Sequence, residues 1–330
     1  MTADLTHGGA LDAMRAAYPD APEPWIDLST GINPWPYPDN SISEAALAHL
    51  PTRALYEACR QSMAKAIGAQ PDALLLAPGS ELLIRLLPDV IGLRRVAILS
   101  PTYGDHAVVW RRAGAQVIES PDPLRLADQV DGVVVTHPNN PDGRIFEAEA
   151  LEAVRAILGA KGGWLIIDEA YSDLVPDRSF SGWGGADGVI VLRSFGKFFG
   201  LAGVRLGALV APQSFRAALA DRLGGWPVSG AALEIGARAY ADERWQNATR
   251  ANLKAAAARL DCILREGGLT PAGGTSLFRY VEITDAHSVF ERLARAGIYV
   301  RRFAWSATHL RIGLPARDEA EQRLANALSP

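Results

Sequence analysis

An apolar run that ends in a carboxylate, Gly163-Trp-Leu-Ile-Ile-Asp168-Glu-Ala-Tyr171, is the strongest indication of the fold. A run of this kind is typical of a strand buried on both faces of a parallel sheet. Asp168 then falls at the carboxyl end of the strand, where open α/β sheets bind their ligands. A buried carboxylate is costly unless it is paired. The stretch therefore predicts a parallel sheet with a polar site at one edge.

Similar apolar runs recur on both sides of this stretch, and helical patterns such as Ala148–Leu158 separate several of them. The runs are Val96–Leu99, Val117–Glu119, Gly132–Thr136, Val189–Leu192 and Leu206–Val210. Alternation of strands and helices favours a mostly parallel α/β sheet with helices on both faces. We expect this large domain to span residues 40–212, with further helices at Ser43–Leu50 and Leu55–Ile67.

The pattern changes near residue 213, and the remainder predicts a small α+β domain. Its expected helices are Ala231–Ala241, Gln246–Glu266 and Ser288–Ala296, and its expected strands are Leu277–Ile283, Ile298–Phe303 and Leu310–Ile312. Residues 1–39 are rich in Pro and Gly, and we expect them to form an extended arm without a helix. The predicted small domain thus comprises residues 1–39 and 213–330.

Lys197 is the candidate nucleophile, in the glycine-rich turn Ser194-Phe-Gly-Lys197 that follows an apolar run. An amine at such a place can form a Schiff base with a carbonyl compound. Arg205 lies eight positions further on and could clamp a phosphate by two hydrogen bonds. An amine with a phosphate clamp is what pyridoxal phosphate (PLP) requires. Penicillin-binding enzymes also carry Ser-x-x-Lys, but their Ser-Asp-Asn and Lys-Thr-Gly tripeptides are absent here.

Three further residues fit the ring of PLP. Asp168 could pair with a protonated pyridine nitrogen, which keeps the ring an electron sink. Tyr171 and Asn140 could hydrogen-bond the phenolic oxygen. Taken singly, Asp168 could cap a helix and Asn140 could be a turn residue, since turns favour Asn-Pro and Asp-Gly. Their order along successive strand ends favours the site.

The turn Gly79-Ser80-Glu81 predicts a phosphate cradle, because backbone N–H groups at a helix N-terminus bind phosphate. Ser80 would add a hydroxyl, and a plain N-cap role for Ser80 is compatible with this. Tyr103 is placed to stack on the cofactor ring, although a tyrosine there could equally belong to the core.

These motifs together resemble the fold type I PLP enzymes, the aspartate aminotransferase superfamily, from about residue 25 to about residue 315. The resemblance rests on Asn139-Asn140-Pro-x-Gly, Asp168-Glu-Ala-Tyr171, Ser194-x-x-Lys197 and Gly200-Leu-Ala-Gly-x-Arg205-x-Gly. It implies a seven-stranded sheet with one antiparallel strand, and a homodimer with its sites at the subunit interface. His137 and Asp142 replace the Asn and Thr that are commoner in this family.

Three segments are similar to the threonine-phosphate decarboxylases of that superfamily: His7-Gly8-Gly9, Asp27 to Asn33-Pro, and Gly225-Trp-Pro-Val-Ser229. The resemblance implies that His7 and Gly8 bind the substrate phosphate, and that Asn33 lies in the first substrate loop. It implies PLP-dependent decarboxylation of L-threonine O-3-phosphate to (R)-1-amino-2-propanol O-2-phosphate, a building block of cobalamin. An aminotransferase, such as one for histidinol phosphate, stays the alternative, because residue types alone do not distinguish the two reactions.

The resemblance also implies that Arg311 grips the substrate carboxylate and Arg301 the substrate phosphate. On a strand Arg301 and Arg302 point to opposite faces, so we expect only Arg301 to reach the site. Without the resemblance, a solvated basic face would be favoured. In related aminotransferases a tyrosine of the neighbouring subunit reaches the PLP phosphate. Here Leu50 stands at that position, so either Tyr56 substitutes or the contact is absent.

Composition agrees with a cytoplasmic enzyme of small molecules. The 330 residues carry a formal charge of −4, which gives no basic footprint for nucleic acid. Cys59 and Cys262 form neither a disulfide framework nor a metal-ligand spacing. No signal peptide or membrane-length apolar run is visible, and no basic helix-turn-helix segment, as in regulators that kept this fold, precedes residue 25.

Overall fold

The computed structural model describes residues 8–329 and divides into two compact units. The larger unit comprises Tyr37–Asn140 and Arg144–Gln246. The smaller unit comprises the described parts of Met1–Pro36 and Asn247–Pro330 together with Pro141–Gly143. Helices α7 (Gln213–Leu223) and α8 (Gly230–Ala241) therefore lie with the larger unit, whereas the sequence predicts a boundary near residue 212.

The larger unit contains a seven-stranded sheet in the order β2-β8-β7-β6-β5-β3-β4. Its strands are β2 (Leu74–Ala77), β3 (Arg95–Leu99), β4 (Gln116–Ser120), β5 (Gly132–Thr136), β6 (Trp164–Glu169), β7 (Val189–Ser194) and β8 (Gly207–Val210). Only β8 runs antiparallel to its neighbours, β2 and β7. This confirms the predicted mostly parallel α/β sheet. Strand β2, four residues long, was not among the predicted strands.

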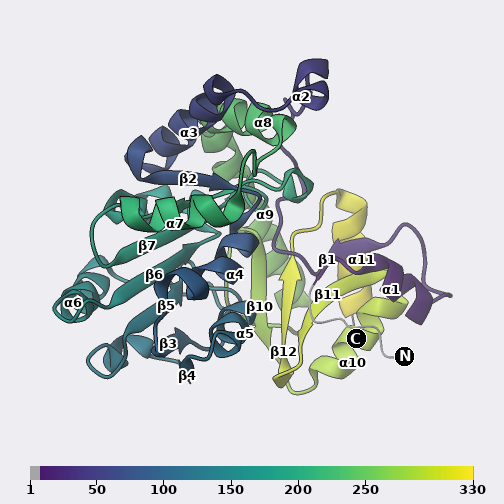
Figure 1. The fold of residues 1–330 in the computed structure, drawn as a ribbon. Helices are drawn as coiled ribbons and strands as arrows, with labels where there is room; N and C mark the ends of the chain where they lie inside the picture. Colours follow the sequence, from purple (N-terminus) through teal and green to yellow (C-terminus); the bar gives the residue numbers. More distant parts are fainter. Residues whose placement is uncertain (1–7, 330) are drawn as a thin grey trace. The chain divides into compact units, whose positions relative to one another are not determined.

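Helices cover the large sheet on both faces (Figure 1). Ile166 and Ile190 belong to one buried cluster with residues of α4 (Ser80–Ile91), α5 (Asp105–Arg112) and α7. Because side chains alternate along a strand, Leu165 and Ile167 face the other way, toward the side where α6 (Ala148–Gly159) contacts β6. Burial on both faces explains why these strands are continuous apolar runs.

The remaining helices of the larger unit are α2 (Glu44–Ala48) and α3 (Arg53–Ile67), while α9 (Glu243–Glu266) begins there and continues into the smaller unit. Helix α3 packs along α8. Its start is capped by the Thr52 hydroxyl, which accepts from the N–H of Leu55. Short 3₁₀ turns occur at Pro71–Ala73, Pro123–Leu126, Ser172–Leu174, Pro176–Arg178, Ser181–Trp183 and Ala202–Val204.

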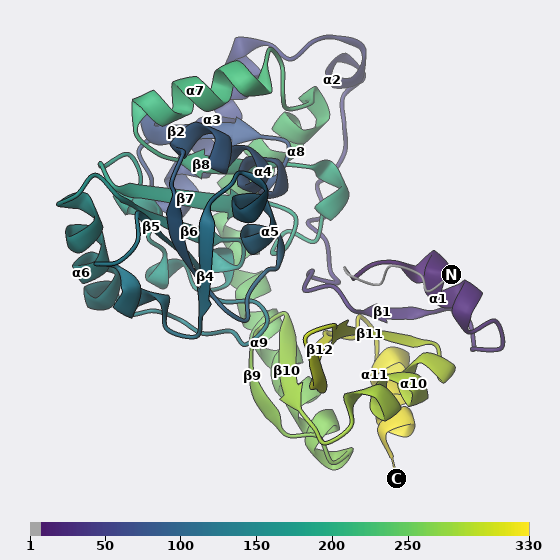
Figure 2. The ribbon, with the colours of Figure 1, turned by 60° about the horizontal axis from the view of Figure 1, so that its bottom comes forward.

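The smaller unit is a five-stranded sheet in the order β1-β11-β12-β10-β9 (Figure 2). Its strands are β1 (Ile26–Leu28), β9 (Pro271–Thr275), β10 (Phe278–Glu282), β11 (Ile298–Phe303) and β12 (Ser306–Gly313). Helix α10 (Ala286–Arg295) packs on β11 and β12 and contacts α11 (Asp318–Leu328). Strand β1 pairs in parallel with β11, so the N-terminal segment completes this sheet.

The expectation that residues 1–39 contain no helix was wrong, because α1 spans Leu11–Ala17. The seven residues LDAMRAA include neither Gly nor Pro, and Met14 is fully buried. The Gly and Pro residues lie before and after this stretch. The high Gly and Pro content of residues 1–39 as a whole therefore concealed a short stretch that can form a helix. Along the described chain, no helix combines the length and apolarity needed to cross a membrane.

Candidate active site

The predicted cofactor residues belong to the larger unit and follow successive strands of its sheet. They are Gly79, Ser80 and Glu81 after β2, Tyr103 after β3, Asn140 after β5, Asp168 and Tyr171 at and after β6, and Ser194, Lys197 and Arg205 at and after β7. Strands β2 to β7 all run in the same direction and end at the same edge of the sheet, whereas β8 runs the opposite way. The topology therefore collects these residues where α/β sheets bind ligands.

Gly79 and Arg205 meet at the start of helix α4. A Cβ atom on Gly79 would lie only 2.8 Å from Nη2 of Arg205, so the guanidinium lies directly against this glycine. Gly79 itself is the N-cap, at φ 92°, and Ser80 is the first helical residue, without a capping hydrogen bond from its side chain. The N-cap role considered for Ser80 is thus wrong. A helix N-terminus beside a guanidinium fits a phosphate.

Asp168 is paired inside the protein, as its burial requires. Its Oδ2 lies 2.9 Å from Nε2 of His106, and both residues are only 2% exposed. Its Oδ1 accepts from the N–H of Ala170 at 3.1 Å. Sequence reasoning missed His106, although a histidine on the buried face of a helix that follows Tyr103 was a usable indication. The carboxylate is held in one orientation, which suits the pairing with a cationic ring nitrogen.

Tyr103 joins the first turns of two helices. Its hydroxyl lies 2.8 Å from Oε2 of Glu81 and 3.1 Å from Oδ2 of Asp105. Burial, followed by the charge of Glu81, raises the pKa of Tyr103, so the hydroxyl remains a donor. The Glu81 carboxylate also pairs with Arg85 at 2.6 Å. The part of Glu81 that fits a phosphate is therefore its backbone N–H.

Asn140, Tyr171 and Lys197 come from three neighbouring loops of the larger unit. Tyr171 is buried, while Asn140 and Lys197 are half-buried. Ser194 is the last residue of β7, and Lys197 follows in a turn where the N–H of Gly200 approaches the Lys197 carbonyl. Lys197 thus follows β7 at the same edge of the sheet where Asp168 and Tyr171 lie at and after the end of β6.

The two predicted substrate arginines are neighbours in the smaller unit. Arg301 of β11 and Arg311 of β12 are direct partners across the antiparallel pair, so their side chains share one face. Arg311 is buried and donates from Nη2 to the Ser29 carbonyl at 2.6 Å. Arg302 lies over the Phe290 ring of α10 at 4.5 Å, on the other face, as the alternation predicts. Like charges opposite each other favour an anion nearby.

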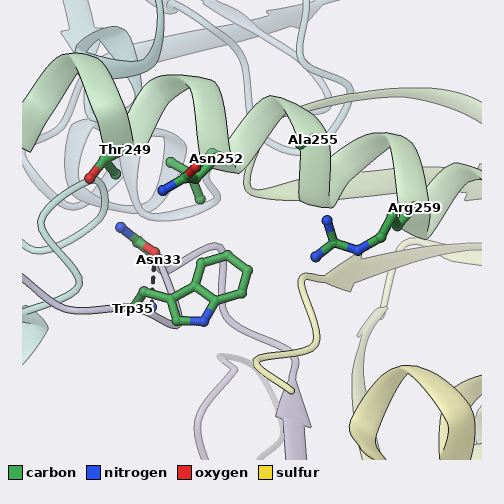
Figure 3. A pocket seen from close by; sticks show the side chains of 7 residues that line it. Asn33, Trp35, Thr249, Asn252, Ala255 and Arg259 are labelled. Atoms are coloured by element: carbon green, nitrogen blue, oxygen red, sulfur yellow. Dashed lines mark hydrogen bonds between the residues drawn. The ribbon is translucent and has the colours of Figure 1, made fainter. Parts of the chain in front are cut away.

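Asn33 lines a pocket of about 290 Å³ within the smaller unit (Figure 3). Trp35 and the α9 residues Thr249, Asn252 and Arg259 line the same pocket. The Asn33 carboxamide oxygen accepts from the Trp35 N–H at 2.9 Å, which holds the loop that follows β1. The other residues that line this pocket are not among the predicted ligands, so the substrate role of Asn33 stays a prediction.

The N-terminal phosphate motif is only partly described. Gly8 packs so closely that a Cβ atom would lie 2.6 Å from the Ser29 carbonyl oxygen, and the Gly9 N–H donates to the Ser29 hydroxyl at 2.8 Å. His7 lies outside the described residues, so its role stays a prediction. Ser29 thus contacts both this motif and Arg311.

Whether Tyr56 substitutes for a tyrosine of the neighbouring subunit stays a prediction. Its hydroxyl oxygen accepts from the Leu76 N–H at 3.0 Å, on strand β2 of its own chain. Leu50, at the position expected for that tyrosine, is 64% exposed.

The chain belongs to the class I and II aminotransferases, whose family model matches residues 24–328. It is 40% identical to threonine-phosphate decarboxylase of Pseudomonas aeruginosa, over 98% of this chain and 97% of that protein. A second threonine-phosphate decarboxylase, from a Sinorhizobium species, is 41% identical over 100% of this chain and 99% of its own.

Solved structures show the same fold. Histidinol-phosphate aminotransferase from Sinorhizobium meliloti, in complex with pyridoxal 5'-phosphate, matches with a TM-score of 0.84 at 20% identity, over 99% of this chain and 96% of its own. Histidinol-phosphate aminotransferase from Clostridium acetobutylicum gives 0.82 at 20% identity, over 92% and 98%.

Proposed function

We propose that this protein is a PLP-dependent decarboxylase that converts L-threonine O-3-phosphate to (R)-1-amino-2-propanol O-2-phosphate. The observation that carries the proposal is the identity of 40% and 41%, over nearly the whole length, to two threonine-phosphate decarboxylases. The histidinol-phosphate aminotransferases reach 29% to 31% over 79% to 90% of this chain. They fit only the alternative, transamination.

The larger unit has the groups that PLP needs. The N-terminus of α4 with Arg205 suits the phosphate, and the close approach of Arg205 to Gly79 is the observation that supports this fit. Lys197 supplies the amine, Asp168 the partner for the ring nitrogen, and Tyr171 with Asn140 the partners for the phenolic oxygen. When bound, PLP supplies a ring that accepts the electron pair left on the substrate Cα.

The residues of the smaller unit would decide which bond to the substrate Cα breaks. In the reaction the bond between Cα and the carboxylate breaks, carbon dioxide leaves, and a proton is added to Cα. Arg311 would grip the carboxylate, while Arg301, His7 and Gly8 would hold the phosphate. Binding energy from the remote phosphate then fixes the orientation at the reacting carbon. Lys197 or another acid would deliver the proton.

The same proposal includes the assembly of the enzyme, its location in the cell and the use of its product. We expect a homodimer in the cytoplasm that acts on a small phosphorylated amino acid, and we expect its product to enter the cobalamin side chain. Sedimentation of the purified holoenzyme measures the assembly, and a single species at the monomer mass of 35.3 kDa would contradict the dimer.

The test is to mix PLP-loaded protein with L-threonine O-3-phosphate and follow products by mass spectrometry. We expect carbon dioxide and aminopropanol phosphate without any added keto acid. A Lys197→Ala variant should be inactive and lack the visible absorbance of the bound cofactor, whereas the exposed Lys254→Ala control should behave as wild type. Glutamate formed from 2-oxoglutarate with histidinol phosphate, and no decarboxylation, would support the aminotransferase instead.

A further inference from the structure

His137 is the fully buried histidine that begins the segment leading from β5 to Asn140. It stands where the family pattern more commonly has asparagine, so the family does not prescribe its role. The candidate site uses Asn140, three positions further on, but not His137 itself. Its ring must therefore be explained by its own contacts.

The hydrogen bonds of His137 define one protonation state. Its Nδ1 accepts from the backbone N–H of Phe146 at 3.1 Å, and an atom that accepts from an N–H carries no proton. Its Nε2 lies 2.9 Å from the Arg178 carbonyl oxygen, to which it must donate. The ring is thus a neutral imidazole protonated at Nε2, with both nitrogens engaged.

These bonds close the base of the loop that carries Asn140. The ring ties residue 137 to residue 146, and the Asn139 N–H bonds to the Arg144 carbonyl at 2.8 Å. Between these pairs the chain leaves the larger unit after Asn140 and returns at Arg144, since residues 141–143 belong to the smaller unit. We call these two bonds, His137 to Phe146 and Asn139 to Arg144, the clamp. The clamp holds together, within the larger unit, the two chain segments on either side of residues 141–143.

The clamp also joins Asn140 to the strand end that carries Asp168 and Tyr171. The Ser172 hydroxyl donates to the His137 carbonyl at 2.7 Å, and the His137 N–H donates to the Asp168 carbonyl at 2.8 Å. The Nε2 bond reaches the segment after β6 at Arg178. The first two bonds use the backbone of residue 137, and the Nε2 bond is the one by which the imidazole connects the loops of two neighbouring strands. Both loops carry predicted cofactor ligands.

Burial is the main cause that lowers the pKa of His137 from its usual 6.5. Glu169, the Arg178 carbonyl and Glu147 oppose this effect, and the Arg178 charge adds to it. The neutral ring therefore stabilises the fold fully above about pH 6.5, and this contribution falls as the pH drops through that value toward the lower native pKa. A protonated Nδ1 would face the Phe146 N–H and could not accept from it.

We propose that His137, as a neutral imidazole, is a positioning residue for Asn140 and so for the cofactor, and that acid releases this clamp. The proposal rests on the proposed function, because it assumes that Asn140 and Tyr171 hold PLP. It predicts that cofactor retention depends on the neutral ring between pH 7.5 and 5.5.

The test measures the rate at which the holoenzyme releases PLP, followed by its visible absorbance after dilution, at pH 7.5 and at pH 5.5. His137→Leu removes both hydrogen bonds and should release cofactor about tenfold faster at pH 7.5, since it leaves a buried N–H unsatisfied. His137→Asn offers a carboxamide oxygen to the Phe146 N–H and should stay within about threefold of wild type. Wild type should release cofactor faster at pH 5.5, and His137→Asn should lack this acceleration.

The exposed His49→Leu variant is the matched control and should keep the wild-type rates at both pH values. Equal acid acceleration in wild type and His137→Asn would overturn the proposal, and so would His137→Leu with wild-type release. A melting temperature lowered in both variants without any change in release would show a purely structural role. If His137→Leu does not fold, the comparison of wild type with His137→Asn still decides whether faster PLP release in acid depends on the His137 ring. Failure of wild type to bind PLP would instead contradict the proposed function.

Discussion

Arg205 shows most directly how single residues shape the candidate site. It is one of two residues other than glycine with positive φ among those described, at 55°. Such backbone costs of order 1–3 kcal/mol and persists only where the surroundings enforce it. Here it turns the guanidinium onto Gly79 at the start of α4. The strain thus coincides with the residue that we assign to the cofactor phosphate.

Gly79→Ala should weaken PLP binding. The alanine Cβ would lie 2.8 Å from the Arg205 guanidinium and would require positive φ, so Arg205 must move. We expect about a tenfold or larger loss in affinity, measured by fluorescence titration of the apoenzyme, from the weakened phosphate contact. Gly92→Ala at the other end of α4 is the control, because it has φ 67° and nothing within 4 Å. Equal affinity losses in both variants would argue against a phosphate role for Arg205.

At the scale of elements, the alternation of side chains along β11 sends two adjacent arginines to opposite faces of the sheet. Arg301 and Arg302 are adjacent in sequence, yet one is opposite Arg311 and the other lies over Phe290 of α10. Strand geometry thereby separates a candidate substrate ligand from a residue that packs on a helix.

Arg301→Met should raise the KM for threonine phosphate by about 100-fold, because a charge-assisted contact to phosphate is lost. Arg302→Met should leave the KM within about twofold and lower stability by about 1 kcal/mol, the worth of its contact with Phe290. Steady-state kinetics and thermal unfolding of both variants provide the check. An unchanged KM in Arg301→Met would remove that residue from the substrate site.

Strands β6 and β7 are also joined by a buried ionic cluster. Arg193 of β7 pairs with Glu169 of β6 at 2.8 Å and with Asp173, and all three are almost fully buried. Burial by itself lowers the pKa of Arg193, but Asp173 and Glu169 raise it more, so the guanidinium stays charged. The cluster lies between the strand of Asp168 and the strand that leads to Lys197.

Arg193→Met should lower the free energy of unfolding by about 3–5 kcal/mol, because it leaves two buried carboxylates without their cation. Arg155→Met, which breaks the largely exposed pair with Glu152 on α6, should cost less than about 1 kcal/mol. Urea unfolding of the two variants measures the difference. A cost below 1 kcal/mol for Arg193→Met would show that the cluster does not stabilise the sheet.

At the scale of the molecule, the two units divide the candidate functions. The predicted cofactor residues belong to the larger unit, and the predicted substrate residues that the structure describes belong to the smaller one. Cofactor and substrate should therefore stabilise different parts of the chain.

Removal of PLP should reduce hydrogen-exchange protection mainly within residues 37–140 and 144–246. A ligand present at about 100 times its Kd stabilises the state that binds it by about 2.7 kcal/mol, and the apoenzyme loses this contribution. Exchange measured by mass spectrometry on holo and apo protein gives the comparison. Equal loss of protection in residues 247–329 would contradict a division of labour between the units.

Local pattern was enough to predict the fold class and much of the candidate site. The apolar run Gly132–Thr136 coincides with β5, because a strand buried on both faces demands this composition. The predicted strand Ile298–Phe303 coincides with β11, although only its first three residues are buried. Helix α1 was missed because its seven residues lie among breakers. Strand β2 was missed because four apolar residues carry little periodicity.

The sequence by itself determined the parallel α/β sheet, the residue types at its strand ends and the family. Only the tertiary structure decided which groups meet: the Asp168 carboxylate with the His106 ring, the Arg205 guanidinium with Gly79, and the His137 ring with the Phe146 backbone N–H. These pairs depend on strand order and loop paths, which local periodicity does not contain. Contacts between residues distant in sequence arise when buried polar groups must find partners, and that requirement is met only in the folded chain.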